Sequence, residues 1–449
     1  MIMEKTGLGD FGNKRRNKVG EELLEKIVQQ RTVTLRKLGK GRGREISYNR
    51  FLHNESVSVE KMLRHAAERT AEIAQGRHVL VIHDTTEINF NRHIKRKMGF
   101  GTVGNGEDIG LFLHPLLAVE AGTGGVLGVA GAFIHNRGAA PVADASPYEP
   151  LESQRWLTAA QRCGVLLKEA AGITMVADRE SDTYEDFSLR PSNVHILARA
   201  AQDRKVKEGG LLFEKARQFP RAHAYVVDVP PKGPHKARTA RVALSFGPVT
   251  LCRPARLAKS ACPETVTLRA VLVEEIRAPA QAEPVCWLLL TSHEVTTVDD
   301  ALLMVNWYKQ RWIIEELNRT LKAQGLDLES SQIVEAKIMA KMVTVALIAA
   351  ARIVQLVRAR SGATGQDFTD GFAEEDLELL IKLSKDNEGK TEKQKNAHPV
   401  RSLAWAAWII GRLGGWNCYY KPPGPKTFHD GLKAFDQIKN GWLLAKRQV

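Results

Sequence analysis

The feature that most constrains this chain is the order of short apolar runs between residues 79 and 199. Three strand-like runs come first, then an amphipathic stretch typical of a helix, and then two more strands separated by a short helical segment. The strand-like runs are VLVIHD from Val79, LFLHPLLAVE from Leu111, VLGVAGAFIH from Val126, ITMVAD from Ile173 and VHILAR from Val194. This order predicts an α/β core.

Two aspartates end strands of this core. Asp84 closes the first run and Asp178 closes the fourth. The order of elements is three strands, then a helix, a strand, a helix and a strand. This is the order of the ribonuclease-H-like fold, in which the first and fourth strands are neighbours. Because ligand sites collect at the carboxyl ends of strands in α/β sheets, we expect the two carboxylates to share metal ions.

The charge of the chain is uneven and strongly basic. The net charge is +14, and residues 1–50 hold thirteen Lys/Arg against six Asp/Glu, a surplus of seven. Such a surplus attracts polyanions and favours nucleic acid as a partner. We therefore expect the amino-terminal segment to contact DNA phosphates, although a merely solvated basic face is the alternative. The candidate residues are Lys14, Arg15 and Arg16, and, in a glycine-containing turn region, Arg42 and Arg44.

Pattern changes along the rest of the chain predict an insertion and further helices. Residues 203–292 contain strand-like runs such as TVTLRAVLVEEI and VCWLLLTS, with a basic, proline-rich loop. Helical periodicity resumes at Thr297 and continues through ALLMVNWYKQRWIIEELNRTLKAQ to the buried apolar helix AKIMAKMVTVALIAAARIVQLVRAR. We predict five domains. They are a helical DNA-binding domain at 1–70, the first part of the core at 71–202, a β-rich insertion at 203–292, the second part of the core at 293–362 and a helical dimerisation domain at 363–449.

Several classes of protein are disfavoured by what the sequence lacks. The cysteines are five, widely spread and without a C-x-x-C pair, which argues against a disulfide framework or a thiolate zinc site. No stretch reaches about 18 uncharged apolar residues, so we expect no membrane association and a cytoplasmic location, on the nucleoid when bound to DNA. The glycine-rich GTVGNGEDIG lacks the Lys-Ser/Thr of a phosphate-binding loop and predicts a hairpin turn, without a nucleotide cofactor.

A third acidic candidate lies on the helix expected after Thr297. Tyr308, Arg311, Glu315 and Lys322 are separated by 3, 4 and 7 residues, which places them along one side of a continuous helix. This arrangement puts a carboxylate between two cations and a phenol. An ordinary ion-paired helix surface is the alternative when this stretch is taken by itself.

The three acidic residues fit one kind of chemistry. In-line cleavage of a phosphodiester uses two divalent ions about 4 Å apart, held by hard oxygen ligands. Carboxylates supply such ligands, so Asp84, Asp178 and Glu315 are the candidate metal and catalytic residues.

These residues resemble a known family. The Asp-Thr-Thr at Asp84, the Asp-Arg-Glu-x-Asp at residues 178–182 and the Tyr-Arg-Glu-Lys signature at residues 308–322 are similar to motifs of the bacterial transposases of insertion sequence four and its relatives. The likeness extends over nearly the whole chain, from GDFGNKRRNK and YNRFLHN to WLLLTS and to GRLGG followed by PPGPKT.

The resemblance implies a homodimer that joins two transposon ends, cuts each by water attack, forms and reopens a hairpin, and joins the freed 3′ hydroxyl to double-stranded target DNA. It implies that the three carboxylates bind Mg²⁺, with Mn²⁺ as a substitute. It further implies that Arg311 and Lys322 hold phosphate near the hairpin and that Tyr308 contacts the DNA end.

Two further residues carry roles implied by the resemblance. Trp287 matches a tryptophan that stacks on a displaced base, which is worth roughly 1 to 3 kcal/mol per base. Its alternative is that it fills the strand core within VCWLLL. Arg199, at the end of VHILAR, matches an arginine that contacts DNA.

Two other functions remain open at this point. A nuclease or junction resolvase on the same fold would cleave without rejoining, and the β-rich insertion and Trp287 speak against it. A DNA-binding regulator would bind ends without catalysis, and the presence of all three acidic residues favours activity instead.

Overall fold

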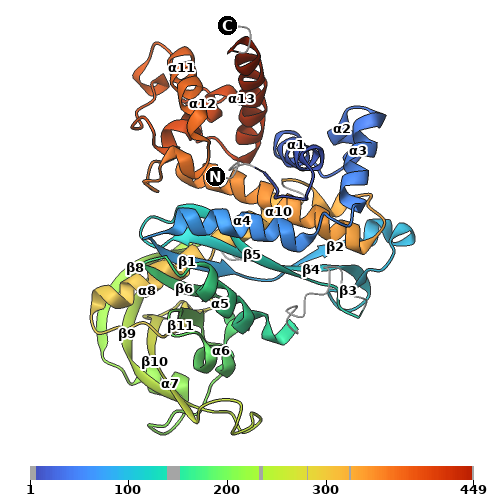
Figure 1. The fold of residues 1–449 in the computed structure, drawn as a ribbon. Helices are drawn as coiled ribbons and strands as arrows, with labels where there is room; N and C mark the ends of the chain where they lie inside the picture. Colours follow the sequence, from blue (N-terminus) through green and yellow to red (C-terminus); the bar gives the residue numbers. More distant parts are fainter. Residues whose placement is uncertain (1–6, 139–151, 232–235, 281, 323–324, 447–449) are drawn as a thin grey trace. The chain divides into compact units, whose positions relative to one another are not determined.

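The computed structural model describes residues 7–138, 152–231, 236–280, 282–322 and 325–446 (Figure 1). The chain forms two compact units. Unit 1 comprises Met1–Arg77, Asp84–Glu149 and Ile313–Val449, and unit 2 comprises His78–His83 and Pro150–Trp312. Each unit is therefore assembled from segments that lie far apart in the sequence.

The amino-terminal part of unit 1 is helical. Its helices are α1 Lys14–Gln30, α2 Leu35–Gly39, α3 Arg42–His53 and α4 Val59–Ala74. The side chain of Asn13 accepts hydrogen bonds from the backbone N–H groups of Arg15 and Arg16, and Ser58 caps α4 in the same way through Lys61. The apolar faces of α1 and α4 are buried, so both helices are amphipathic and this segment is helical as expected.

Residues 35–53 differ from the turn region that the glycines suggested. Lys40 takes the left-handed conformation at φ 48°, and Gly41 is the residue before α3. These residues separate two helices, so Arg42 and Arg44 lie in the first turn of α3 rather than in a turn region. The expectation was wrong because the glycines interrupt the helices only at their ends.

An antiparallel sheet follows in unit 1. Its strands are β2 Thr86–Asn89, β3 Gly101–Val103, β4 Asp108–Glu120 and β5 Val126–His135, with the 3₁₀ turn η1 Asn91–Arg96 between β2 and β3. Strand β4 pairs with β2, β3 and β5. The β3–β4 connection is the predicted hairpin turn, with Gly104 and Gly106 at positive φ.

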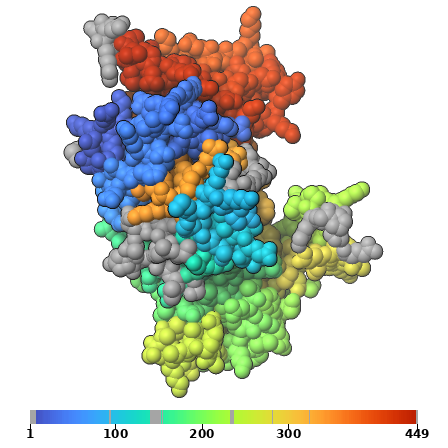
Figure 2. Space-filling view, turned by 90° about the vertical axis from the view of Figure 1, so that its right-hand side faces the viewer, coloured from blue at the N-terminus to red at the C-terminus, as the bar shows by residue number. Residues whose placement is uncertain are grey.

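The remaining helices of unit 1 include one long apolar helix, α10. They are α9 Ile313–Leu321, α10 Ala336–Ala359, α11 Leu377–Asn387, α12 Leu403–Leu413 and α13 Pro425–Lys446, with 3₁₀ turns at η4 Leu328–Ser330, η5 Phe368–Asp370, η6 Glu374–Asp376 and η7 Glu392–Gln394. Helices α4 and α10 pack against β5 (Figure 1). Helix α1 contacts α13, and the amino-terminal helices (blue) and carboxyl-terminal helices (red) lie side by side in Figure 2.

Helix α10 forms the core of unit 1. It contacts α1, α3, α4, α9, α12 and α13 as well as β4 and β5. Within the described ranges it is the one helix long and apolar enough to cross a membrane, and 83% of its most apolar window is buried inside the protein. This agrees with the expected buried core helix.

Unit 2 is built on a mixed sheet with the strand order β1-β6-β7-β11-β10-β9-β8. The strands are β1 His78–His83, β6 Gly172–Ala177, β7 His195–Arg199, β8 Arg221–Val229, β9 Arg238–Cys252, β10 Thr265–Glu275 and β11 Cys286–Thr291. The helical segments are η2 Glu152–Gln154, α5 Arg155–Leu166, η3 Arg179–Ser181, α6 Tyr184–Leu189, α7 Leu212–Arg217 and α8 Val298–Gln310. Strands β1, β6 and β7 are parallel, and the others join antiparallel.

The protein is therefore of the mixed α/β class, as predicted. The strands expected from the apolar runs are present, including those of the β-rich stretch, where β8 is an additional strand. The five-domain division stays a prediction, and the two compact units are a coarser division with other boundaries.

Candidate functional site

The predicted acidic residue Asp178 directly follows β6. Its carboxylate accepts a hydrogen bond from the backbone N–H of Glu180 at 2.8 Å, which starts the η3 turn. The hydroxyl of Ser181 donates to the backbone oxygen of Asp178 at 3.0 Å. Asp178 is half-buried, so its carboxylate is held in place by a short turn while part of it stays open to solvent.

A second acid of the same motif has a structural role. Asp182 is 1% exposed, and its carboxylate accepts hydrogen bonds from the backbone N–H groups of Ala201 and Gln202 at 2.7 and 2.8 Å. It also forms an ion pair of 3.1 Å with the buried Arg204. These contacts tie the loop after β6 to the loop after β7, and they support the position of Asp178.

Aromatic and cationic side chains gather near Asp178 within unit 2. We call Arg199, Trp287, Tyr308 and Arg311 the aromatic–arginine cluster. Arg199 ends β7 and donates from Nη2 to the backbone oxygen of Cys286 at 2.8 Å. The rings of Trp287 and Tyr308 meet edge to face, with centroids 6.0 Å apart. Three separate elements, β7, β11 and α8, therefore position the cluster.

The charges of the cluster act on one another. Burial raises the pKa of the Tyr308 phenol, the nearby Asp178 carboxylate raises it further, and the Arg311 and Arg199 guanidinium groups act in the opposite direction. Burial lowers the pKa of Arg199, and the charge of Arg179 adds to this effect. Tyr308 is thus electrostatically coupled to two predicted arginines and to the predicted carboxylate.

The half-buried state of Trp287 bears on its two alternatives. Its neighbours Leu288, Leu289 and Leu290 are at most 1% exposed, whereas Trp287 keeps part of its surface open to solvent. This open surface is compatible with stacking on a base. Because tryptophan is rarely buried completely even where it fills a core, the core-filling alternative also fits.

The other two predicted carboxylates belong to unit 1. Asp84 directly follows β1 in the sequence and accepts a hydrogen bond from the backbone N–H of Thr85 at 2.8 Å. The Thr85 hydroxyl lies 2.9 Å from Nδ1 of the fully buried His114. Glu315 lies in the first turn of α9 and is half-buried, and Lys322 follows the end of α9.

The Tyr-Arg-Glu-Lys signature does not lie on one continuous helix. Helix α8 ends at Gln310 and α9 begins at Ile313. Between them, the N–H groups of Arg311 and Trp312 bond to the carbonyls three residues earlier, at 3.0 and 3.2 Å, rather than four. This tighter turn interrupts the helix, so the predicted continuous helix is wrong. Tyr308 and Arg311 belong to unit 2, and Glu315 and Lys322 belong to unit 1.

The structure thus brings together part of the predicted site. It gathers Asp178, Arg199, Trp287, Tyr308 and Arg311 in unit 2, and it places Asp84, Glu315 and Lys322 in unit 1. In the part of the chain that the structure describes, no group of three or more His, Cys, Asp or Glu side chains is close enough to hold a metal ion. The carboxylate oxygens themselves are the hard ligands that Mg²⁺ and Mn²⁺ prefer.

Arg179 is a member of the site that the sequence analysis did not single out. It is exposed, directly follows Asp178 and acts electrostatically on Arg199. Its place beside a strand-ending aspartate in the Asp-Arg-Glu motif was the signal that could have identified it. It adds a further cation to the surroundings of Arg199.

The predicted basic residues of the amino-terminal segment lie at helix starts. Lys14 and Arg15 are exposed in the first turn of α1, and Arg42 and Arg44 are exposed in the first turn of α3. Arg44 also forms an ion pair of 3.2 Å with Glu22. A helix N-terminus carries a partial positive charge and favours acidic side chains, so helix stability does not explain these cations.

Arg16, the third basic residue at this helix start, has a structural contact. It is half-buried and donates from Nη1 to the backbone oxygen of Phe11 at 2.5 Å. This bond holds the chain that leads into α1, so Arg16 is less available to a ligand than Lys14 and Arg15.

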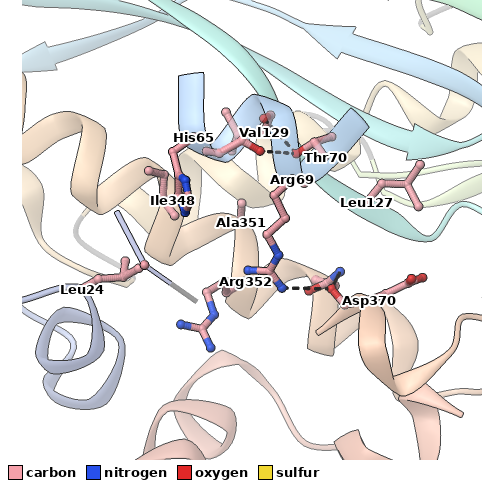
Figure 3. Close-up of a pocket in the computed structure, with 14 residues that line it drawn as sticks. Leu24, His65, Arg69, Thr70, Leu127, Val129, Ile348, Ala351, Arg352 and Asp370 are labelled. Carbon is pink, nitrogen blue, oxygen red and sulfur yellow. Dashed lines mark hydrogen bonds between the residues drawn. The ribbon is translucent and has the colours of Figure 1, made fainter. Parts of the chain in front are cut away.

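Unit 1 contains a small cavity that is too small for a substrate. It measures about 50 Å³ and lies among Arg69, Thr70, Arg352 and Asp370 (Figure 3). The Thr70 hydroxyl donates to the backbone oxygen of Val129 at 3.0 Å. This space fits a few water molecules rather than a substrate. We therefore do not assign function to it.

The sequence matches no protein-family model.

Proposed function

We propose that this chain is a cut-and-paste DNA transposase of the kind that its sequence resembles. In this proposal the core strands and helices form a ribonuclease-H-like fold with a β-rich insertion. The observation that carries the proposal is the gathering of the aromatic–arginine cluster beside Asp178 at the carboxyl ends of β6 and β7. A carboxylate with cations, a phenol and a half-open indole suits a DNA end that carries both phosphates and an unpaired base.

The strand pairing supports the roles of the two aspartates. Strands β1 and β6 are parallel neighbours, and Ile82 is paired with Val176. Asp84 and Asp178 each stand two residues after a member of this pair. The proposal requires that Glu315 meets them in the complex with DNA.

The three carboxylates would hold divalent ions in this site. Mg²⁺, or Mn²⁺ in its place, would activate the attacking oxygen and stabilise the leaving oxygen of an in-line displacement. Around these carboxylates, Arg311 and Lys322 neutralise phosphate charge, since charge-assisted hydrogen bonds from cations to phosphate oxygens are strong.

The aromatic members of the cluster hold the DNA end. Tyr308 can donate its hydroxyl proton to a phosphate oxygen, because a phenol is protonated at neutral pH and burial raises the pKa of this one further. Trp287 stacks on a displaced base through its open surface, while its edge-to-face contact with Tyr308 fixes the ring.

The carboxyl-terminal helices are suited to dimerisation, as the proposal requires. Ile438, Leu443 and Leu444 on α13 are 38%, 44% and 62% exposed. These exposed apolar side chains near the end of α13 are available for contact with a partner. A second copy of the chain is the proposed partner.

The test uses a labelled duplex whose sequence is taken from inverted repeats that flank the gene. The purified protein is incubated with this duplex and Mg²⁺, and the products are separated by denaturing and native electrophoresis. Hairpin and joined products are expected. Nicks alone would identify a nuclease, and a shifted but uncut duplex would identify a DNA-binding regulator.

Substitution of the acids tests the assigned roles. Asp84→Ala, Asp178→Ala and Glu315→Ala are expected to abolish cleavage while retaining duplex binding, because the carboxylates act on the reacting phosphate rather than on the whole duplex. Glu169→Ala removes an acid that is exposed in unit 2, and this control is expected to cleave normally. Retained cleavage in one of the three variants removes that residue from the site.

A further inference from the structure

A second cationic site lies in unit 1, in a pocket of about 430 Å³. Its volume is within the range of small-ligand sites, roughly 300 to 1,000 Å³. The pocket is lined by residues from several helix ends, namely Arg31, Glu316, Arg319, Thr320, Val354, Val357, Arg360, Pro425 and Lys426. Helices α1, α9 and α13 each contact α10, which brings these ends together.

The lining carries a surplus of positive charge. Arg31, Arg319, Arg360 and Lys426 face one acidic residue, Glu316. Arg319 and Lys426 are exposed and give access from solvent, whereas Arg31 and Arg360 are half-buried. The pocket therefore combines a positive field with an opening through which an anion can enter.

The existing contacts use only part of the hydrogen-bonding capacity of these cations. Arg360 donates from Nη1 to the backbone oxygen of Pro423 at 2.7 Å, and Arg319 donates from Nε to the backbone oxygen of Glu315 at 3.3 Å. The Nε of Arg31 is buried and makes no hydrogen bond. Each guanidinium has five N–H donors, so donors remain for a ligand.

Helix electrostatics explain some of these cations but not all. Arg31 and Arg360 follow the C-terminal ends of α1 and α10, and Arg319 lies in the last turn of α9, where cations stabilise a helix. Lys426 lies in the first turn of α13, where a cation is unfavourable, and that turn contains no acidic residue. An anion bound here would be favoured both by Lys426 and by the N-terminal end of this 22-residue helix.

We propose that this pocket binds a phosphate group, and that the phosphate belongs to the backbone of DNA held by the protein. The DNA source rests on the proposed function, whereas the phosphate chemistry does not. Arg319 and Lys426 are the residues that first meet the phosphate, and Arg31 and Arg360 lie deeper. The pocket thereby extends the DNA-contacting surface of unit 1 beyond the amino-terminal helices.

The test compares the double variant Arg319→Gln/Lys426→Gln with the control Lys433→Gln, which removes an exposed cation of the same helix α13. The full chain is titrated with a fluorescent 30-base-pair duplex in Ca²⁺ at several salt concentrations. Each neutralised phosphate adds about 0.9 to the slope of log affinity against log salt. The double variant is expected to lose about 0.9 from this slope, which corresponds to about eightfold weaker binding at 0.1 M salt.

Two measurements separate the DNA-backbone assignment from the phosphate-binding role of the pocket. If the double variant and the control bind the duplex alike, the DNA-backbone assignment is overturned. If the wild-type chain binds no duplex at all, the proposed function fails by itself, and titration with inorganic pyrophosphate then tests the pocket. If the wild-type chain binds pyrophosphate and the double variant does not, the phosphate site is supported, with a source other than DNA. If both bind pyrophosphate equally, or neither binds it, the phosphate site is overturned.

Discussion

Polar side chains have different surroundings at the two edges of the unit 2 sheet, that is, at the amino-terminal and at the carboxyl-terminal ends of its parallel strands. At the amino-terminal edge, His195 and His293 stack with ring centroids 3.8 Å apart, and the Thr174 hydroxyl lies 2.8 Å from Nε2 of His293 and 2.9 Å from Nε2 of His78. At the carboxyl-terminal edge, Asp178 stands beside the aromatic–arginine cluster and remains half-buried.

The difference separates stability from binding. The amino-terminal edge consists of rings that contact one another, and burial lowers the pKa values of His78, His195 and His293 so that these rings stay neutral. The carboxyl-terminal edge keeps charged groups partly desolvated, which costs free energy where these groups are not fully paired and hydrogen-bonded. We infer that the first edge serves folding, and the second edge serves ligand binding in the proposed function.

The largest expected effect concerns the buried support of the carboxyl-terminal edge. Asp182→Ala removes the partner of the buried Arg204 and leaves that charge uncompensated, so the free energy of unfolding should fall by about 3–5 kcal/mol. Urea-induced unfolding followed by tryptophan fluorescence measures this change. Should Asp182→Ala fail to fold, Asp182→Asn provides the second measurement, and a loss below about 1 kcal/mol in either variant would show that this pair does not support the edge.

An intermediate effect on stability is expected when the pH is lowered, because of a buried histidine at the amino-terminal edge. The pKa of His293 is lowered to about 3 by burial and by the neighbouring histidines, whereas an unfolded histidine titrates near 6.5. Below pH 6.5 the unfolded chain gains a proton that the folded chain does not, so stability falls as the pH falls toward 3. Between pH 6.5 and 5 this group should cost about 2 kcal/mol.

His293→Gln measures that contribution. The slope of unfolding free energy against pH should become shallower between pH 6.5 and 5 by about one proton. His223→Gln, which removes an exposed histidine on β8, is the matched control and should leave the slope unchanged. Equal slopes in both variants would contradict the assignment of a neutral amino-terminal edge.

The smallest effect on stability is expected when the proposed catalytic residue Asp178 is replaced. Asp178→Asn keeps an oxygen that can accept the hydrogen bond from the Glu180 N–H, so the free energy of unfolding should change by less than about 1 kcal/mol. Cleavage should nevertheless be lost. A variant that cleaves normally, or one that is destabilised as strongly as Asp182→Ala, would remove the contrast between the two aspartates.

Much of the fold could be predicted from the sequence because burial imposes a readable pattern. Strands β1 and β6 are buried along most of their length and appear as continuous apolar runs. Strand β8 escaped prediction because its first residues, from Arg221 to Ala224, are exposed and its conformation depends on pairing with β9.

The site was predictable where it follows strand ends and was missed where it depends on tertiary structure. The strand-ending Asp178 and Arg199 could be identified in the sequence, since each closes an apolar run. The break at Arg311 and Trp312 could not, because no glycine or proline marks it and only three-residue hydrogen bonds create it. The pocket cations were missed for a related reason, since Arg31 and Lys426 are brought together only by helix packing.

The central position of helix α10 has a consequence for how the chain is synthesised. Helices α1, α3 and α4 pack against α10, yet 285 residues separate the end of α4 at Ala74 from the end of α10 at Ala359. At about 5–20 residues per second, the ribosome needs roughly 15–60 s to make this stretch. During that time the amino-terminal helices lack α10, one of their packing partners, so part of their apolar surface stays uncovered until α10 emerges.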